Sequence, residues 1–407
     1  MRILIINQPF WPDVVATAQH MSDWADHLAS RGHTVTVIAS RSVYGTQGAV
    51  LPKSEIHHGI HIHRVGSNLF RKGRILTRLV DFALFHLRAL WKTLTLPKQD
   101  VVVCLTTPPF IGIVGMIAKS LRGSHYIQYE MDLYPDVSIA LGVLPPHSLS
   151  AKILERLHRR LLRSADRVVV LGRCMARLIE SKGIPLEKLL LVTPWADPDA
   201  VRPIPRDQNP FRKLHNLQNQ KVIMYSGNLG LAHDTDTLLA LIEHYKDDPA
   251  LRFVFIGGGK KMDQLRRIAA EKKLTNLLML DYVPRENLSD MLSAADLHLI
   301  TQAAGTAGII VPSKLYGILA AGRPSLYIGP PDTEIAYQLR ESMAGVVVAV
   351  GDSQGAIRAL DKALQTSTAL TETRSREALH GHTRAECVAK LTDMVESLAK
   401  TITNLTN

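Results

Sequence analysis

The stretch KVIMYSGNLG, residues 221–230, decides the fold class. Its apolar run from Val222 to Tyr225 predicts a buried strand that ends in a glycine turn. The pattern recurs, with helical stretches between, at LRFVFIGGG (251–259), NLLMLDYV (276–283), ADLHLI (295–300) and SLYIG (325–329). Strands that are apolar throughout and alternate with helices indicate a parallel sheet covered on both faces.

The first half of the chain repeats this organisation. Its expected strands are RILIINQPF (2–10), HTVTVIAS (33–40), VVVCL (101–105), SHYIQYE (124–130) and RVVVLG (167–172). We therefore predict an α/β protein with two doubly wound, Rossmann-like domains that face each other across a cleft. The expected segments are a first domain (1–200), a linker in a proline-rich stretch (201–220), a second domain (221–380), and a C-terminal helix that packs back toward the first domain (381–407).

Composition excludes several classes of protein. The three cysteines are widely spaced, which predicts neither a metal cluster nor a disulfide framework. Residues 3–6 are too short an apolar run for a signal peptide, and two prolines interrupt the uncharged segment 101–118, which argues against a membrane span. Of the net charge of +11, the first 200 residues contribute most, with 24 Lys and Arg against 15 Asp and Glu. An anionic partner should therefore meet the first half of the chain.

The most specific stretch for function is VPSKLYGILAAGRP, residues 311–324. Pro312 and Ser313 predict a helix start, with Ser313 as a candidate N-cap. Lys314 then lies in the first turn, where the helix dipole disfavours a cation. A bound diphosphate would resolve that conflict, whereas the alternative is a solvated lysine on an ordinary helix.

A second glycine-rich turn suggests a different class of enzyme. In IGGGKK, residues 256–261, a strand opens into a helix, and Asp281 follows at a distance typical of dinucleotide-binding folds. The GxGxxG pattern that starts at Gly257 fails, however, because Met262 stands at its last position. The first βα turn of the chain contains no glycine either, so an NAD-dependent oxidoreductase is only the runner-up.

These motifs resemble family 4 retaining glycosyltransferases of the GT-B fold, most closely the bacterial branch that makes surface polysaccharides such as colanic acid. SKLYGILAAGRP is similar to the family's PSKLYEYMAAGKP, and TPWADPDAVRP (193–203) to its linker signature PNWADPD. The opening MRILIINQPFWPD and the segments MDLYPDVSIALG (131–142), YSGNLG, FVFIGGG, DYVPRENLSDMLSAADLHLI (281–300), and DTEIAYQL with AGVVVAVGD also match in order. The resemblance covers nearly the whole chain.

The resemblance also implies donor-binding positions. Tyr282, Val283 and Pro284 are expected at the nucleobase, and Ser313, Lys314 and Leu315 at the diphosphate and nucleotide. Ala16 and Thr17 are expected to approach from the first domain. The full implied set is Ala16, Thr17, Asn228, Gly230, Gly257, Gly258, Tyr282, Val283, Pro284, Ser313, Lys314 and Leu315.

The chain departs from the family pattern at its two glutamates. The glutamate that usually contacts the ribose aligns with Gly317, and the earlier one with Ile309. The basic residues that many members carry after the YSGNLG turn are also absent, with Leu231 and His233 in that region. We therefore expect Lys314 to neutralise a larger part of the negative charge of the diphosphate than it does in members that keep those basic residues.

Carboxylates cluster at the end of the expected strand 124–130. Glu130 and Asp132 lie at i and i+2, where they can orient acceptor hydroxyls or act as a base, and we take them as the catalytic candidates. Asp136 is expected to cap the following turn and helix. Without a metal cluster, the leaving diphosphate must be stabilised by Lys314 and helix N-termini.

Residues 68–94 account for the basic first half. On a helix of 100° per residue, Arg71, Arg74, Arg78 and Arg88 share one arc with Phe85, and Phe82 lies beside it. The opposite side carries Leu79 and Leu87 among other leucines. Basic residues with interleaved aromatic residues favour an anionic membrane surface, although a core helix with a solvated basic face stays open. No motif for nucleic-acid recognition accompanies the helix.

Together these features predict a glycosyltransferase of the hexosyl- or N-acetylhexosaminyl-transferase class. It uses a nucleotide-diphosphate donor, expected to be a UDP-sugar, with no cofactor and no metal. The expected acceptor is a lipid-linked saccharide at the inner face of the cytoplasmic membrane, where the enzyme is peripheral, and retention is implied by the resemblance. A soluble acceptor and a non-catalytic partner protein are the alternatives.

Overall fold

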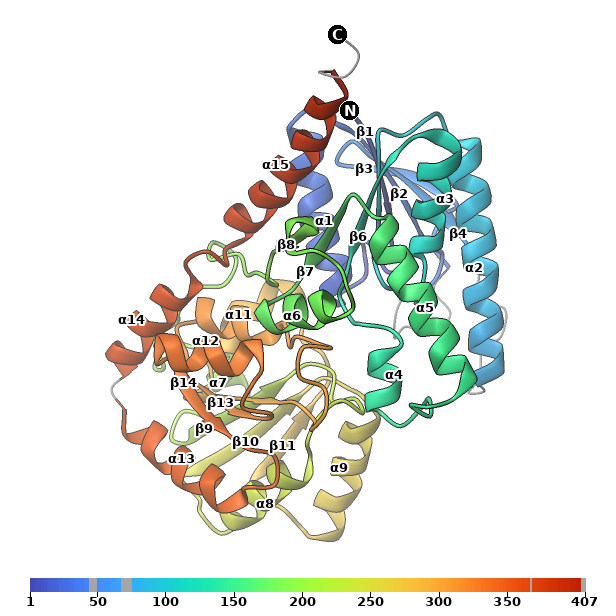
Figure 1. The fold of residues 1–407 in the computed structure, drawn as a ribbon. Coiled ribbons are helices and arrows are strands. Elements are labelled where there is room, and N and C mark those ends of the chain that lie inside the picture. The colour runs from blue at the N-terminus through green and yellow to red at the C-terminus, as the bar shows by residue number, and fades with distance from the viewer. Residues whose placement is uncertain (44–49, 67–74, 367, 404–407) are drawn as a thin grey trace. The chain divides into compact units, whose positions relative to one another are not determined.

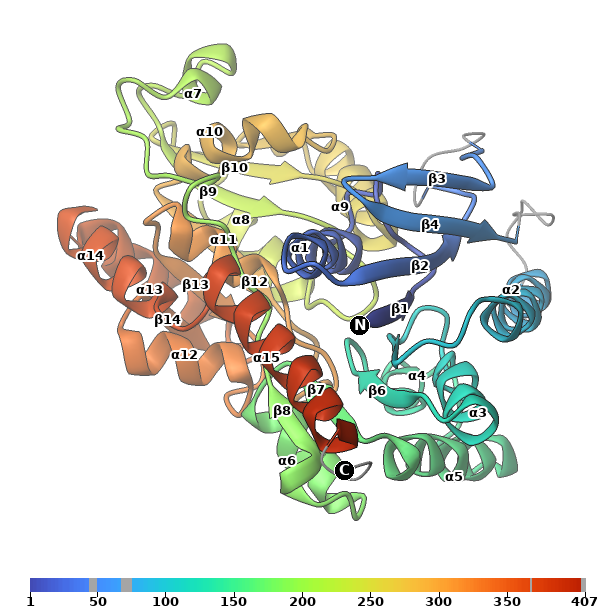
Figure 2. The same cartoon turned by 90° about the horizontal axis from the view of Figure 1, so that it is seen from above.

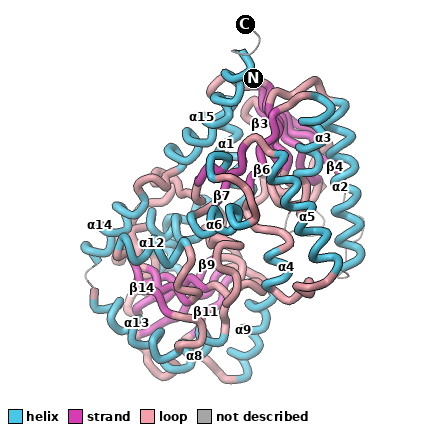
Figure 3. Tube along the Cα trace, viewed as in Figure 1, coloured by secondary structure: helices cyan, strands magenta, loops and turns pink. Residues whose placement is uncertain are grey.

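The computed structural model describes residues 1–43, 50–66, 75–366 and 368–403. It divides into two compact units, Met1–Thr193 with Ala385–Asn407 and Pro194–Arg384. In each unit a sheet is sandwiched between helices (Figures 1 and 3). The fold class predicted from the apolar strands is therefore confirmed: both units are Rossmann-like α/β domains with parallel sheets.

The first unit is built on an eight-stranded sheet in the order β3-β4-β2-β1-β5-β6-β7-β8. All neighbours are parallel except β3 and β4. The strands are β1 (Arg2–Ile6), β2 (Thr34–Ser40), β3 (Ser54–His57), β4 (Ile60–Val65), β5 (Val101–Cys104), β6 (His125–Tyr129), β7 (Arg167–Val170) and β8 (Leu189–Leu191).

Helices cover both faces of this sheet (Figure 2). On one face, α1 (Ala16–Ser30) packs against the C-terminal helix α15 (Arg384–Thr403), where the Trp24 indole donates to the Thr392 hydroxyl at 3.2 Å. The opposite face carries α2 (Ile75–Thr95), α3 (Gly112–Arg122) and α5 (Leu149–Ser164). The remaining elements of the unit are α4 (Asp136–Ala140), α6 (Arg173–Ser181) and the 3₁₀ turn η1 (Leu186–Lys188).

The second unit contains six parallel strands in the order β11-β10-β9-β12-β13-β14. They are β9 (Lys221–Ser226), β10 (Leu251–Ile256), β11 (Leu277–Leu280), β12 (Leu297–Thr301), β13 (Ser325–Ile328) and β14 (Gly345–Val348). Its helical elements are α7 (Pro210–Leu214), α8 (Asp236–His244), α9 (Lys260–Glu271), η2 (Arg285–Asn287), α10 (Leu288–Ser293), α11 (Lys314–Ala320), α12 (Glu334–Ser342), α13 (Ser353–Gln365) and α14 (Thr368–Leu379). Each face of the sheet has its own hydrophobic core.

The proline-rich stretch before β9 folds onto the second unit. It contains α7, and the buried guanidinium of Arg212 donates to Asp296 at 2.6 Å. Asn209 caps α7 by accepting from the Arg212 backbone N–H. These contacts fix the entry of the chain into β9, whose carboxyl end forms part of the site described below.

The face on which α2 packs differs from the one expected. Phe85 is only 1% exposed and lies with Ala89 in the core, whereas Leu87 and Trp91 are 64% and 72% exposed. Both sides of this helix carry large apolar residues, so periodicity alone could not select the buried one. Phe85 is therefore not a surface residue. Arg71 and Arg74 lie outside the described residues, and no helix that the structure describes is long and apolar enough to span a membrane.

Candidate functional site

Two glycine turns lie side by side at the carboxyl ends of β9 and β10. Gly227 and Gly257 both adopt positive φ, 120° and 123°, which favours glycine. A Cβ on Gly257 would clash with the carbonyl oxygen of Gly227, so close approach of the two turns also requires glycine. The Leu229 N–H donates to the Gly258 carbonyl at 2.7 Å and locks the turns together.

Lys314 reaches this pair of turns from the start of α11. Its Nζ lies 3.6 Å from the centre of the Tyr225 ring and 3.7 Å from where a Cβ of Gly227 would stand. The Nζ atom is shielded from solvent and has no hydrogen-bond partner among the residues that the structure describes. Burial lowers its pKa to about 7, because a charged ammonium in this setting lacks both water and a counter-ion. The cation–π contact with the Tyr225 ring offsets only part of the cost of burying this charge.

Further positive charge surrounds the site. The Lys261 ammonium, from the first turn of α9, donates to the backbone carbonyl of His233. Burial, followed by the charge of Lys314, lowers the pKa of His233 to about 3, and its Nδ1–H donates to the Thr301 carbonyl at 2.8 Å. His233 is therefore neutral. The two nearby lysines bring a local excess of positive charge to the turn after β9.

Of the three residues expected at the nucleobase, Tyr282 lies beside the same turns. The Tyr282 ring is 57% exposed and packs within 3.4 Å of the Cβ position of Gly258. Val283 is half-buried against the core, and Pro284 precedes η2. An exposed ring next to a glycine surface offers a flat platform on which a base can stack.

The remaining implied donor residues have more limited roles in this geometry. The Asn228 side chain lies within 3.3 Å of the Cβ position of Gly230, beside the glycine turns. Ser313 stands at the N-cap position of α11, but its side chain makes no capping hydrogen bond, so the expected cap is wrong. Leu315 is fully buried and can offer only its backbone. Ala16 and Thr17 open α1 in the first unit.

At the position of the missing ribose glutamate, a side chain would fit only after a small shift of one neighbouring methyl group. A Cβ on Gly317 would meet only the Leu292 Cδ1 atom, at 3.3 Å. Glu334, the nearest carboxylate downstream, is 4% exposed and accepts from Gln338 within α12. Glu334 is thus a buried side chain that hydrogen-bonds within its own helix.

In the first unit, the two catalytic candidates differ in accessibility. Glu130 is 1% exposed, and its Oε1 lies 3.2 Å from the Nε2 of the buried His158 on α5. Asp132 is half-buried, and burial together with the neighbouring Glu130 raises its pKa to about 6. Asp132 is therefore the carboxylate of this pair that a ligand can reach, while Glu130 and His158 form a buried pair behind it.

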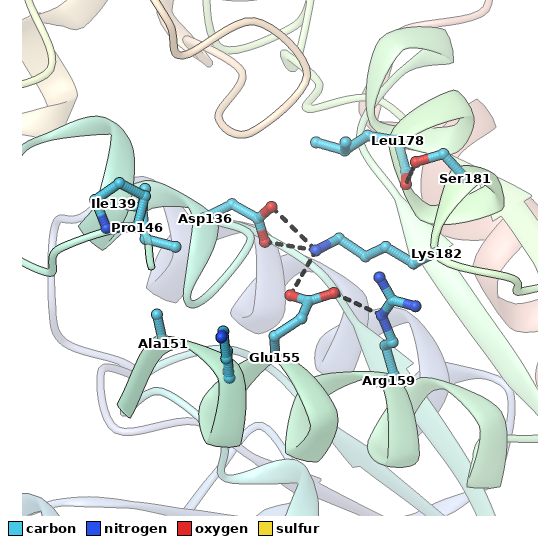
Figure 4. A pocket seen from close by; sticks show the side chains of 10 residues that line it. Asp136, Ile139, Pro146, Ala151, Glu155, Arg159, Leu178, Ser181 and Lys182 are labelled. Atoms are coloured by element: carbon cyan, nitrogen blue, oxygen red, sulfur yellow. Dashed lines mark hydrogen bonds and ion pairs between the residues drawn. The ribbon is translucent and has the colours of Figure 1, made fainter. Parts of the chain in front are cut away.

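Asp136 does not act as a helix cap. Both its oxygens accept from the Lys182 ammonium, at 3.0 and 2.9 Å, and Lys182 also donates to Glu155 at 2.9 Å. The long-range ion pair outweighs the local cap because Lys182 is itself buried. Asp136, Glu155 and His158 could in principle ligate a metal, but the Lys182 ammonium already lies between the two carboxylates (Figure 4).

Comparison with known families agrees with this geometry. Residues 16–195 match a model described as "Glycosyl transferase 4-like domain", and residues 207–379 match "Glycosyl transferases group 1". This chain belongs to the family 4 glycosyltransferases of the GT-B fold. The enzyme class predicted from the SKLYGILAAGRP motif is thereby confirmed.

Two curated relatives are similar over most of the glycosyltransferase. WbjE of Pseudomonas aeruginosa, assigned as a glycosyltransferase, is 28% identical over 72% of this chain and 73% of its own. WcaI of Escherichia coli K12, assigned to colanic acid biosynthesis as a glycosyl transferase, is 23% identical over 86% of this chain and 88% of its own. Both relatives are thus assigned as glycosyltransferases, and the assignment of WcaI names a polysaccharide pathway.

Solved structures share the fold at low sequence identity. The sucrose-phosphate synthase of Thermosynechococcus elongatus superposes with a TM-score of 0.79 at 13% identity, over 98% of this chain and all of that one. HepE of Anabaena in complex with UDP-glucose gives 0.71 at 15% identity, again over 98% and 100%.

Several residues at these sites were missed from the sequence. The sequence pattern places Tyr225 only in a strand, whereas in the structure its ring centre lies 3.6 Å from the Lys314 Nζ. The same pattern places Lys261 only in a glycine-rich turn. His158, Glu155 and Lys182 lie in ordinary helical sequence, and no local spacing indicates that they meet.

Proposed function

We propose that this glycosyltransferase transfers a sugar from a UDP-sugar to a lipid-linked saccharide, with retention at the anomeric carbon. The donor binds in the second unit, with its diphosphate at Lys314. The observation that carries the proposal is the buried ammonium of Lys314, which meets no counter-ion in the described part of the chain and lies at two glycine turns. A diphosphate would supply the missing negative charge, and the backbone of glycine turns can approach phosphates closely.

The chemistry proposed for the donor needs no cofactor. The departing diphosphate develops charge in the transition state, and a preorganised ammonium stabilises it without further reorganisation. Tyr282 provides the platform for the nucleobase. We propose a uracil base, supported by the UDP-glucose complex of HepE, which has the same fold.

Asp132 is proposed to orient or deprotonate the acceptor hydroxyl. A pKa of about 6 leaves this carboxylate ionised near neutral pH and basic enough to accept a proton. Glu130 acts as a positioning residue: its buried charge, paired with His158, raises the pKa of Asp132 and holds the loop in place.

A screen of nucleotide sugars for thermal stabilisation tests the donor assignment. UDP-sugars should raise the melting temperature more than GDP- or ADP-sugars, because a ligand that binds the folded state stabilises it by mass action. UDP should inhibit transfer as a competing product. Stabilisation by GDP-sugars alone would exclude the uracil base while leaving the glycosyltransferase assignment intact.

We further propose that α2 attaches the enzyme to the inner face of the cytoplasmic membrane. Leu79, Val80, Leu87 and Trp91 form an exposed apolar stripe along α2, here called the α2 stripe. Arg78 and Arg88 are also exposed on this helix. An apolar stripe flanked by cations suits anionic lipid headgroups, and it lies in the half of the chain that carries most of the positive charge.

Vesicle flotation tests this attachment. The wild-type protein should float with vesicles of phosphatidylglycerol and phosphatidylethanolamine, and less so at about 0.5 M salt because screening weakens the ionic part. The double variant Leu87→Glu/Trp91→Glu should stay in the soluble fraction. Leu214→Glu, at an equally exposed leucine of the second unit, is the matched control. Equal flotation of the double variant and the control would remove the membrane proposal.

A further inference from the structure

A cavity of about 350 Å³ lies in the first unit among α4, α5 and the end of α6 (Figure 4). Its apolar side includes Ile139 and Leu178. Its polar side is formed by the charged and hydroxyl side chains of Asp136, Glu155, Arg159, Lys182, Lys152 and Ser181. The volume falls within the ~300–1,000 Å³ typical of small-molecule sites. Neither the donor site nor the Asp132 loop uses this cavity.

The charged groups of the cavity are held in fixed positions. The buried ammonium of Lys182 donates to Asp136 and to one oxygen of Glu155, and the Arg159 Nε donates to the other oxygen of Glu155 at 2.7 Å. In Figure 4 these groups form one connected row along the cavity. Mutual pairing removes rotational freedom from each side chain, so the site is preorganised.

This pairing argues against a metal ion or a phosphate as the ligand. A metal would have to displace the Lys182 ammonium, which already lies between the two carboxylates. A phosphate would face both carboxylates, and two of the three lining cations, Lys182 and Arg159, are already paired with them. The third, Lys152, is exposed to solvent, which weakens its attraction for an anion. The site therefore favours a ligand without net charge.

Hydrogen-bonding capacity remains for such a ligand. The Asp136 and Glu155 side chains are 20% and 26% exposed, and carboxylate oxygens keep lone pairs beyond those used by Lys182. Arg159 has further N–H groups besides its Nε. A sugar hydroxyl both donates and accepts, so it can bridge a carboxylate and a guanidinium. The C–H face of a sugar ring can pack against Ile139 and Leu178.

The cavity is also connected to the proposed acceptor carboxylate. His158 lies one helical turn from Glu155 on α5 and pairs with Glu130, which precedes Asp132 by two residues. A ligand in the cavity would thus contact Glu155, one turn along α5 from the histidine that pairs with Glu130.

We propose that this cavity is a saccharide subsite that binds an uncharged sugar residue of the acceptor. The inference rests on the proposed function, because it assigns part of the acceptor to the first unit. The hydrogen-bonding groups of Asp136, Glu155 and Arg159 bind the hydroxyl groups of the sugar. The apolar side chain of Leu178 packs against the C–H face of the sugar ring and disfavours a charged group.

Saturation-transfer NMR with methyl glycosides tests the subsite. The probes are the methyl α-glycosides of glucose, galactose, mannose and N-acetylglucosamine, each at millimolar concentration. At least one should receive saturation from the wild-type protein, and a saturating UDP-sugar should not displace it. Leu178→Trp should abolish the signal by filling the cavity, while Leu186→Trp, at an exposed leucine outside it, should leave the signal unchanged.

A second variant tests the subsite independently, in case Leu178→Trp disturbs the fold. Glu155→Gln keeps the shape of the side chain but removes its charge, and it should weaken the same signal at least severalfold in protein with an unchanged melting curve. No signal from any probe, a signal that persists in Leu178→Trp, or displacement by the UDP-sugar would each overturn the subsite. Thermal stabilisation by the UDP-sugar, measured on the same samples, reports separately on the proposed function.

Discussion

Two buried lysines, one in each unit, lie in opposite electrostatic environments. Lys182 in the first unit is paired with two carboxylates. The ammonium of Lys314 in the second unit meets an aromatic ring and, within residues 1–43, 50–66, 75–366 and 368–403, no hydrogen-bond acceptor. A paired cation is satisfied before any ligand arrives, and an unpaired one is not. The first site is therefore suited to neutral hydroxyl groups and the second to an anion. This difference matches a saccharide acceptor and a nucleotide-diphosphate donor.

The largest expected effect concerns the chemistry of the first unit. Asp132→Asn should lower the rate of sugar transfer by about 100-fold, the lower end of the range for a positioned general base. In the wild type, kcat/KM for the acceptor should rise with pH through about 6, because Asp132 must be ionised. The variant should lose this rise. An unchanged pH profile in Asp132→Asn would show that the leaving diphosphate takes the proton.

Removing the charge of Lys314 should have the next largest effect. Lys314→Met should weaken binding of the UDP-sugar by about 10–100-fold, since a hydrogen bond to a charged group contributes about 1.5–3 kcal/mol. Lys314→Arg should recover part of the affinity. Titration calorimetry measures both, and an unchanged dissociation constant in Lys314→Met would remove this residue from the donor site.

The two lysines should affect stability in opposite directions. Lys182→Met leaves two facing carboxylates and should lower the free energy of unfolding by about 1–3 kcal/mol, less than for a fully buried pair because the carboxylates are partly exposed. Lys314→Met removes an unpaired buried charge and should raise it at pH 6.

The stabilisation by Lys314→Met should shrink as the pH rises. The folded-state pKa of about 7 lies below the ordinary value of 10.5, so between these values the unfolded chain binds more protons. Wild-type stability from this group therefore increases across that window. Urea unfolding at pH 6 and pH 9 measures the difference. A loss of stability in Lys314→Met at pH 6 would mean that the ammonium has a counter-ion.

The smallest expected effect is an increase in donor affinity. Gly317→Glu should strengthen donor binding severalfold if the new carboxylate reaches the ribose, as it does in the related family motif. The substitution also replaces a helix glycine, which costs up to about 1 kcal/mol relative to other residues. Thermal shift with and without the UDP-sugar separates the two contributions. A gain in stability without a gain in affinity would show that the ribose lies elsewhere.

The sequence pattern predicted the structural features that depend on residues close together in the chain. Apolar runs located the strands around Val222 and Phe253, and the glycine turns followed from their positions at strand ends. These features depend on short-range pattern and on the topology common to doubly wound sheets. The placing of Lys314 and Asn228 in one site, by contrast, was implied by the family resemblance. In the structure the Lys314 Nζ lies 3.7 Å from where a Cβ of Gly227, the residue before Asn228, would stand.

Features that depend on distant partners could not be derived from the sequence. Asp136 was expected to cap a helix, but its partner Lys182 is 46 residues away. The pairing of His158 with Glu130 likewise joins a helix to a strand end 28 residues earlier. For α2, the neighbouring helix and strands buried Phe85 rather than Leu87, because both helix faces were apolar enough to pack. Such choices are made by tertiary packing.

The most direct test of the unpaired lysine is the proton balance of donor binding. Calorimetry of the UDP-sugar selected by the thermal screen, in buffers of different ionisation enthalpy, gives the protons taken up per ligand. The diphosphate of a UDP-sugar has no titrating proton near neutrality. We predict uptake approaching about one proton at pH 8.5, almost none at pH 6, and none in Lys314→Met. Equal proton uptake in the wild type and in Lys314→Met at pH 8.5 would contradict the assignment.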